Sequence, residues 1–118
     1  MLITNNYKIQ ENNTIIGEIC LWQYEGFEYP HIEFEIKKDY QRQGFMTKHL
    51  PIFLEQITDK VIVAVVNPSN LVSIKLLTDN SFVELGNIGG YKNFIYINKK
   101  ASTGKDGAVK KEKLFKNN

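Results

Sequence analysis

The sequence has few of the residues that stabilise a fold through disulfides or metal ions. Its single cysteine, Cys20, excludes a disulfide within the chain, and one cysteine with two separated histidines does not give the spacing of a metal site. No apolar run approaches the roughly 20 residues of a membrane span, and no charged region followed by an apolar core marks a signal peptide. A Walker phosphate loop and a dinucleotide fingerprint are also missing. We therefore expect a soluble, cytoplasmic protein without a metal, a disulfide or a membrane partner.

The composition is typical of one globular domain followed by a basic segment. With 118 residues, 42% of them hydrophobic, the chain is long enough for one core and too short for a second domain. Residues 99–118 carry seven lysines against Asp106 and Glu112, a net charge of +5, whereas the eight basic and eleven acidic residues before them give −3. The segment lacks an apolar period, so we predict a domain over residues 1–98 and a disordered tail over 99–118. The tail would act either as a solubilising appendage or as a contact to nucleic acid or the ribosome.

The first third of the domain has the pattern of β-strands. A short strand is expected over residues 7–10, before an Asn-rich turn, and a longer one over 14–24, which is rich in Ile and Leu. Over residues 31–36 apolar side chains alternate with charged ones, which is typical of a strand with one face in water. Because the connection over residues 25–30 is short, the last two of these strands are predicted to pair as an antiparallel hairpin.

The middle of the chain predicts a βαβ unit. Apolar residues at spacings of three and four predict a helix over about 45–57, although Pro51 would either cost the helix about 3 kcal/mol or end it at Leu50. The aliphatic run over residues 60–66 is typical of a strand covered on both faces. Strand, helix and strand over residues 31–66 would then form a parallel unit with a right-handed crossover.

A second helix and a last pair of strands complete the predicted domain. A second helix is predicted by a buried stripe of Leu71, Ile74 and Leu77. It is expected to end near Asn80, a residue suited to a left-handed C-cap. Two strands follow, over residues 82–85 and 93–98. The predicted fold is α+β, with a mixed, mostly antiparallel sheet around the central βαβ unit and the element order ββαβαββ.

The connection that precedes the first predicted helix, residues 39–47, has the features of an anion-binding turn. A turn that opens a helix directs several backbone N–H groups at one point, where the helix dipole adds about half a positive charge. Gly44 permits a positive φ and the close approach of a ligand. An ordinary turn is the alternative, because a single glycine between a strand and a helix is common.

Two segments of the sequence resemble the GNAT superfamily of acetyltransferases. Gln41-x-x-Gly44-x-Met46 resembles the Q/R-x-x-G-x-G/A loop that binds the pyrophosphate of acetyl-CoA, with Met at the last, usually small position. Residues 44–50 look like the G-x-M-T-E-A-L variant found in the branch that acetylates ribosomal proteins and other amino termini. Residues 70–82 are similar to that branch's N-x-x-S-I-R-V-L-E-K-L-G-F segment, with Ser in place of the usual Gly.

This resemblance, which covers roughly residues 14–98, implies an acyl-CoA N-acyltransferase-like fold and an acetyl-CoA-dependent N-acetyltransferase. Such an enzyme moves the acetyl group directly to an amine in a ternary complex, and the amine would be a protein lysine, an amino terminus or a small amine. The backbone from Ile36 to Lys38 is implied to pair with the pantetheine arm. The residues implied to bind the pyrophosphate are Gln41, Arg42, Gln43, Gly44, Phe45, Met46 and Thr47.

Asn70 and Ser73 are implied to act at the thioester end of the donor. In the resembled branch the matching Asn contacts the donor, and the matching Ser lies near the sulfur, where its hydroxyl would protonate or stabilise the leaving thiolate. Many family members use a Tyr four residues after that Ser as the acid, but Leu77 stands here, so Ser73 is the candidate acid. Both residues also suit a plain helix-capping role.

Glu33 and Glu35 are the candidates for the general base. They lie on the polar face of the strand that should border the donor, where a carboxylate accepts an amine proton, directly or through water, if burial raises its pKa. Strand alternation alone would also place both in solvent. His31 begins the same strand and is more typical of a surface histidine or of one whose hydrogen bonds are satisfied. His49 is expected on the polar side of the first helix.

The N-terminal part of the chain departs from the family. Only about thirteen residues precede the strand at 14–24, whereas family members have a strand and two helices there that form one wall of the acceptor site. Either the acceptor site is open to a macromolecular amine, or a second subunit of a homodimer completes it, or catalysis has been lost. The alternative to an enzyme is therefore a non-catalytic module with the GNAT fold that binds acyl-CoA or another protein.

Overall fold

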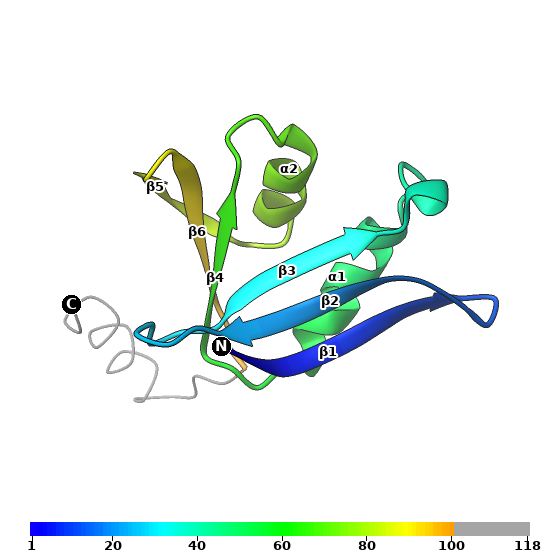
Figure 1. The fold of residues 1–118 in the computed structure, drawn as a ribbon, viewed down its shortest axis with the longest axis horizontal. Helices are drawn as coiled ribbons and strands as arrows, with labels where there is room; N and C mark the ends of the chain where they lie inside the picture. The colour runs from blue at the N-terminus through cyan, green and yellow to red at the C-terminus, as the bar shows by residue number, and fades with distance from the viewer. Residues whose placement is uncertain (101–118) are drawn as a thin grey trace.

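Six strands form one mixed sheet, in the order β1-β2-β3-β4-β6-β5, in the computed structural model, which describes residues 1–100 (Figure 1). The strands are β1 (Leu2–Glu11), β2 (Thr14–Gln23), β3 (His31–Ile36), β4 (Val61–Val66), β5 (Val83–Ile88) and β6 (Tyr91–Ile97). The connections include a 3-10 helix, η1 (Lys38–Tyr40), and the helices α1 (Phe45–Gln56) and α2 (Leu71–Asp79). The element order therefore contains the predicted ββαβαββ, preceded by β1.

The strands β1, β2 and β3 form an antiparallel meander. Asn12 and Asn13 make the first turn with φ values of 49° and 67°, which matches the twist of a tight hairpin. The predicted hairpin between the second and third strands is confirmed, with a register that runs from Gly17 opposite Ile36 to Trp22 opposite His31. The first strand spans ten residues and is longer than predicted, because its polar N-terminal half pairs with β2 although its own sequence carries little strand signal.

The parallel βαβ unit is also confirmed. Strands β3 and β4 pair in parallel, and α1 connects them. This helix continues through Pro51 and does not end at Leu50. Leu50, Phe53 and Leu54 are at most 5% exposed, and burying each contributes about 1.5–3 kcal/mol, which together outweighs the roughly 3 kcal/mol that an interior proline costs.

Both helices pack on one face of the sheet, which we call the inner face. Cross-strand register places alternate residues of β2, β3, β4 and β6 on this face. These residues form one core with the buried sides of the helices: Ile19, Leu21, Ile32, Ile62, Ala64 and Phe94 from the strands, and Leu50, Phe53, Leu54, Leu76 and Leu77 from the helices. The opposite, outer face of the sheet carries no helix within residues 1–100 (Figure 1).

The second helix corrects two details of the sequence analysis. Leu71, expected in the buried stripe, is 72% exposed, because it is the first residue of α2. Leu77 is fully buried, as predicted, and Leu76 is buried beside it. The left-handed residue after the helix is Ser81, with a φ of 71°, whereas Asn80 has a φ of −105°. Ser81 thus has the conformation that the resembled segment assigns to glycine.

The described part of the chain ends beside α1. Lys100, which the sequence analysis placed in the tail, donates from Nζ to the carbonyl oxygens of Leu54 and Glu55 at distances of 3.1 and 2.5 Å. The remaining tail, 101–118, lies outside the described residues, so its disorder and its contact with nucleic acid or the ribosome stay predictions. No helix within residues 1–100 has the length and apolar character to cross a membrane.

Candidate functional site

The central feature of the site is a fork, formed where β3 and β4 separate. The two strands pair only at His31 and Val63, beside a bond from the Val63 N–H to the Pro30 carbonyl of 2.9 Å. From this point β3 runs toward η1 and β4 toward the start of α2 (Figure 1). The rest of each strand therefore lacks its neighbour on the fork side, and a helix N-terminus follows each of the two strands.

Gly44 makes the start of α1 an open anion cradle. It is the N-cap with a φ of 82°, and it has no side chain with which to cap the helix. A Cβ built on Gly44 meets no atom within 4 Å, so the space beside it is open. The first helical N–H groups have no partner within an α-helix, and the N-terminal dipole favours an anion there. A phosphate or pyrophosphate therefore fits the residues of this turn.

Arg42 and the glutamines on either side of it shape the loop before the cradle. Arg42 has a φ of 64°, a strained value for a residue with a Cβ. The side chain of Gln41 donates from Nε2 to the carbonyl of Ile36 at 2.8 Å, and that of Gln43 donates to the carbonyl of Asp39 at 3.2 Å. Both glutamine side chains are thus engaged within the loop, which leaves the backbone N–H groups as the groups for binding a ligand.

The other predicted donor-binding residues lie around this loop. Ile36 ends β3, and Lys38 begins η1. Phe45 and Met46 are partly buried against the core, whereas Thr47 is exposed in the first turn of α1. The fold therefore brings the predicted pantetheine and pyrophosphate segments together, at the end of β3 and the start of α1.

Asn70 and Ser73 lie at the start of α2. The Oδ1 of Asn70 accepts a hydrogen bond from the Ser73 N–H at 3.2 Å, so Asn70 caps the helix. Ser73 is half-buried, and its hydroxyl has no hydrogen-bond partner within residues 1–100. Leu77, four residues later, is fully buried, so it keeps this side of the helix in the core. The capping role is present, and a contact of either residue with a donor stays a prediction.

Glu33 and Glu35 are exposed on the outer face of β3, as strand alternation alone predicts. The hydroxyl of Tyr24 donates to Glu33 Oε2 at 3.1 Å. Burial, and then the bond to Glu33, raises the pKa of Tyr24. Because both carboxylates lie in solvent, neither meets the condition of burial that the sequence analysis set for a general base.

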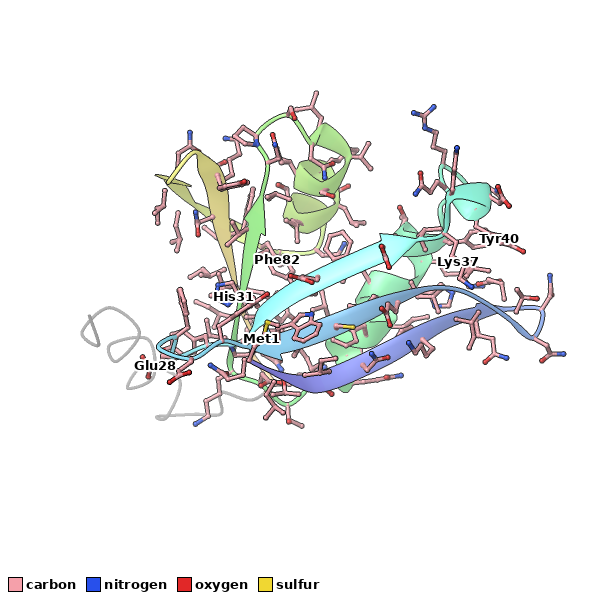
Figure 2. The ribbon with its side chains drawn as sticks, in the orientation of Figure 1. Met1, Glu28, His31, Lys37, Tyr40 and Phe82 are labelled. Carbon is pink, nitrogen blue, oxygen red and sulfur yellow. The ribbon has the colours of Figure 1, made fainter. Side chains whose placement is uncertain are left out.

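His31 lies at the vertex of the fork, opposite Val63. The sequence analysis gave it no catalytic role. The half-buried ring of His31, labelled in Figure 2, packs edge-on against two aromatic rings. These are Tyr24 and Phe27, each at 5.1 Å between ring centroids. Burial lowers the pKa of His31, so its imidazole is neutral at physiological pH. A neutral imidazole at this place is able to accept a proton. The only feature of the sequence that points to this role is that His31 is the first residue of a strand that enters a βαβ unit.

An outer-face hollow of about 200 Å³ lies over β2 and β3, beside the fork. Register places Glu18 opposite Glu35 and Cys20 opposite Glu33. Lys8 binds Glu18 at 2.6 Å and lowers the pKa of that carboxyl, whereas Glu35 has no ion pair within residues 1–100. The hollow is therefore acidic, and it includes aromatic surface; its lining residues are Glu18, Cys20, Trp22, Glu33, Phe34 and Glu35.

Two further residues are placed by the structure. Cys20 is 5% exposed, and burial raises the pKa of its thiol, so the thiol is a weak nucleophile. His49 was expected on the polar side of α1, but it is 6% exposed and lies between the Tyr7 hydroxyl, at 2.9 Å, and Glu11 Oε2, at 2.7 Å. Its buried position arises because α1 packs against β1, a strand longer than predicted. No group of side chains within residues 1–100 is arranged to hold a metal ion.

The sequence matches the family model described as "Acetyltransferase (GNAT) domain" over residues 3–83. This chain belongs to the GNAT acetyltransferase family. The match includes β1 to α2, and therefore the cradle and the fork. Among the curated proteins, none matches the chain.

Solved structures of GNAT proteins share the fold. Ribosomal-protein-S5-alanine acetyltransferase from Vibrio fischeri matches with a TM-score of 0.63 at 21% identity, over 77% of this chain and 58% of its own. A spermidine N-acetyltransferase SpeG chimera from Vibrio cholerae and hSSAT gives 0.69 at 18%, over 83% and 69%. The putative acetyltransferase yncA from Salmonella typhimurium, solved with its cofactor acetyl-CoA, gives 0.63 at 17%, over 75% and 61%. This GNAT chain thus spans 58–69% of the length of these relatives.

Proposed function

We propose that this chain is an acetyl-CoA-dependent N-acetyltransferase that transfers an acetyl group to a positively charged amine compound. The observation that carries the proposal is the open cradle at Gly44, at the end of a strand that has separated from its parallel neighbour. The GNAT family match and the acetyl-CoA found with yncA support this donor.

The chain's own groups would hold the donor at two places. The backbone N–H groups of residues 43–47 would bind the pyrophosphate, with the cationic side chain of Arg42 next to them. Acetyl-CoA bound there would supply the activated acetyl group. The fork leaves the backbone of β3 free to pair with an extended arm, which would direct the thioester toward His31. Ser73, with its unpaired hydroxyl, is the proposed acid for the leaving thiolate.

The acceptor amine must lose a proton before it attacks. His31 is the proposed base on geometry, because it lies at the fork vertex and is neutral, and Glu33 with Glu35 is the alternative, acting through water. A pH profile separates the two. If His31 is the base, activity falls as pH drops and the imidazole takes up a proton, and His31→Gln removes most of the activity together with this acid limb. If Glu33 or Glu35 is the base, the acid limb persists in His31→Gln.

The outer-face hollow favours an acceptor with positive charge beside the reacting amine. Glu33 and Glu35 offer carboxylates, and Trp22 offers an aromatic face that attracts cations. Lysine-rich segments and polyamines share this chemistry, and spermidine is named for one of the structural neighbours. We expect Glu35→Gln to raise the KM for spermidine more than the KM for a monoamine.

The first experiment is thermal unfolding with and without acetyl-CoA. At a ligand concentration about a hundred times Kd, binding stabilises a fold by roughly 2.7 kcal/mol, which is an easily measured rise in Tm. Gly44→Glu should abolish the shift, because it places a carboxylate in the cradle. Gly26→Glu is the matched control, since Gly26 has a similar φ of 86° and equally open space around it. An equal shift in the wild type and Gly44→Glu would contradict the donor site.

A non-catalytic acyl-CoA-binding module is the second candidate. Leu77 in place of the family's Tyr acid and the exposure of both glutamates favour it. Turnover with a panel of amines separates the candidates, because a module would show the donor-dependent shift in Tm without releasing CoA.

A further inference from the structure

The first turn of α1, residues 45–48, forms one side of the cradle and lacks contacts that usually hold such a turn. Gly44 has no side chain to cap the helix, and the first turn of α1 contains no acidic residue to compensate the dipole. Pro51 has no N–H to donate to the carbonyl of Thr47, four residues earlier, so one of the bonds between the first and second turns is missing. The orientation of this turn therefore depends on contacts from outside the helix.

Glu11, the last residue of β1, supplies such contacts. Its Oε2 accepts hydrogen bonds from Lys48 Nζ, at 2.9 Å, and from His49 Nε2, at 2.7 Å. Because a carboxylate only accepts, Nε2 carries the ring proton, and Nδ1 of the neutral ring accepts from the Tyr7 hydroxyl at 2.9 Å. Both nitrogens of the buried ring thus have a partner on β1. We call Tyr7, Glu11, Lys48 and His49 the β1–α1 bracket.

The β1–α1 bracket joins the cradle end of α1 to a strand that the sheet fixes. Strand β1 pairs with β2 from Leu2 to Glu11. On the helix, the Lys48 N–H donates to the Gly44 carbonyl at 3.1 Å and so closes the turn that begins at the cradle. Lys48, and then His49, lower the pKa of the Glu11 carboxyl, which is therefore ionised at physiological pH.

We propose that Glu11 is a positioning residue for the donor: it fixes the first turn of α1, and thereby the direction in which the N–H groups of residues 45–47 point into the cradle. This inference rests on the donor site proposed above, and Glu11 acts through Lys48 and His49. Charge alone predicts the opposite effect, because a carboxylate near an anionic pyrophosphate repels it and its removal should strengthen binding. The sign of the change in donor affinity therefore separates the two.

Isothermal titration calorimetry of the full chain with coenzyme A, well below the Tm of each variant, tests the proposal. Glu11→Ala removes the carboxylate, and Glu11→Asp keeps the charge on a side chain too short to hold both partners. Both should raise the Kd about fivefold or more, as expected for a residue that acts on a site through a hydrogen-bonded network. Glu84→Ala is the matched control, because it removes a carboxylate that pairs with Lys92 at 3.0 Å on β5 and β6, away from α1 (Figure 1), and should keep the wild-type Kd.

Circular dichroism confirms that each variant is folded. A wild-type Kd in folded Glu11→Ala, even with a lower Tm, would overturn the inference, because Glu11 would then only stabilise the fold, and a lower Kd would overturn it because charge would dominate. In both cases the donor site itself would stand. A wild type that does not bind coenzyme A would overturn the donor site and this inference with it. Should Glu11→Ala fail to fold, Glu11→Asp decides with the same expected result.

Discussion

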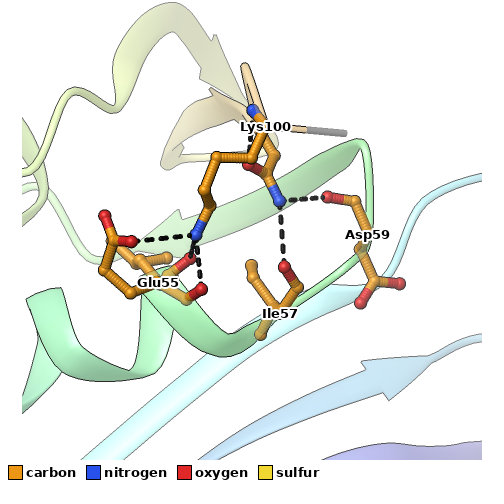
Figure 3. A network of polar contacts seen from close by, with 6 residues as sticks. Glu55, Ile57, Asp59 and Lys100 are labelled. Carbon is orange, nitrogen blue, oxygen red and sulfur yellow. Dashed lines mark hydrogen bonds and ion pairs between the residues drawn. The ribbon is translucent and has the colours of Figure 1, made fainter. Parts of the chain in front are cut away.

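Asn98 joins the end of the sheet to the loop that precedes β4, and its replacement by Asp gives a sharp test of this contact. Figure 3 labels its partners Ile57, Asp59 and Lys100. The side chain is 1% exposed. Its Nδ2 donates to the carbonyls of Ile57, at 3.2 Å, and Asp59, at 3.0 Å, and its Oδ1 accepts from the Lys100 N–H at 3.2 Å. Its own N–H donates to the Lys60 carbonyl at 2.8 Å.

Asn98→Asp keeps the size of the side chain and removes both side-chain donors. Two buried carbonyl groups then lose a partner, at about 1–3 kcal/mol each, and a carboxylate faces two carbonyl oxygens. We expect the free energy of unfolding at pH 7 to fall by about 4 kcal/mol, a large part of the roughly 5–15 kcal/mol of a typical domain. With an unfolding entropy of about 2.1 cal/mol/K per residue, Tm should fall by roughly 15–20 °C.

The loss should depend on pH. Burial and the two carbonyl oxygens raise the pKa of the introduced carboxyl in the folded protein above its unfolded value of about 3.9. Between these two pKa values the folded state binds more protons than the unfolded state, so the variant becomes less stable as pH rises and recovers stability as pH falls. The difference in the free energy of unfolding between Asn98→Asp and the wild type should therefore be smaller at pH 4.5 than at pH 7. The higher the pKa of the introduced carboxyl in the folded protein, the larger this change with pH.

Urea unfolding followed by the fluorescence of Trp22, the single tryptophan, measures both effects. Asn93→Asp is the control, because Asn93 is less buried and donates only to the Tyr91 carbonyl, at 3.1 Å, so its loss should stay below about 1 kcal/mol. A loss under 1 kcal/mol for Asn98→Asp, or one that is the same at both pH values, would refute the reasoning.

Three other substitutions have expected outcomes. Gly17→Ala should lower the free energy of unfolding by about 3 kcal/mol in urea titration, because the alanine Cβ would collide with the backbone carbonyl of Glu35 across the hairpin. A loss below 1 kcal/mol would show that β2 and β3 move apart at this point without cost. Arg42→Gly should raise the free energy of unfolding by up to about 1 kcal/mol, and with it Tm, because glycine removes the strain of a φ of 64°. A lower Tm would mean that the Arg42 side chain stabilises the loop. The pKa of His31 is lowered in the folded protein, so just below pH 6.5, the unfolded pKa of His, the unfolded state binds more protons and the wild type loses stability as pH falls. His31→Gln should remove this dependence of stability on pH. Urea midpoints of both proteins at pH 7 and pH 5 measure the difference.

Local patterns in the sequence were sufficient for most elements and for the backbone geometry of the turn at Gly44. The alternation over β3, the aliphatic run of β4 and the glycine between a strand and a helix each depend on a few neighbouring residues, since backbone periodicity and turn chemistry act over that range. Two spaced motifs then sufficed to indicate the GNAT family. The cradle at Gly44 has the left-handed φ that the loop residues predict.

Only the tertiary structure decided which segments pack against each face of the strands and helices. The burial of His49 follows from the crossing of α1 and β1, and the exposure of Val65 contradicts the expectation that β4 is covered on both faces. The acidic hollow depends on the register that sets Glu18 opposite Glu35, and the fork depends on where parallel pairing with Val63 stops. An amino-acid pattern specifies that a side chain points to one face of a strand, but the partner on that face comes from a distant segment, and only the folded chain determines it.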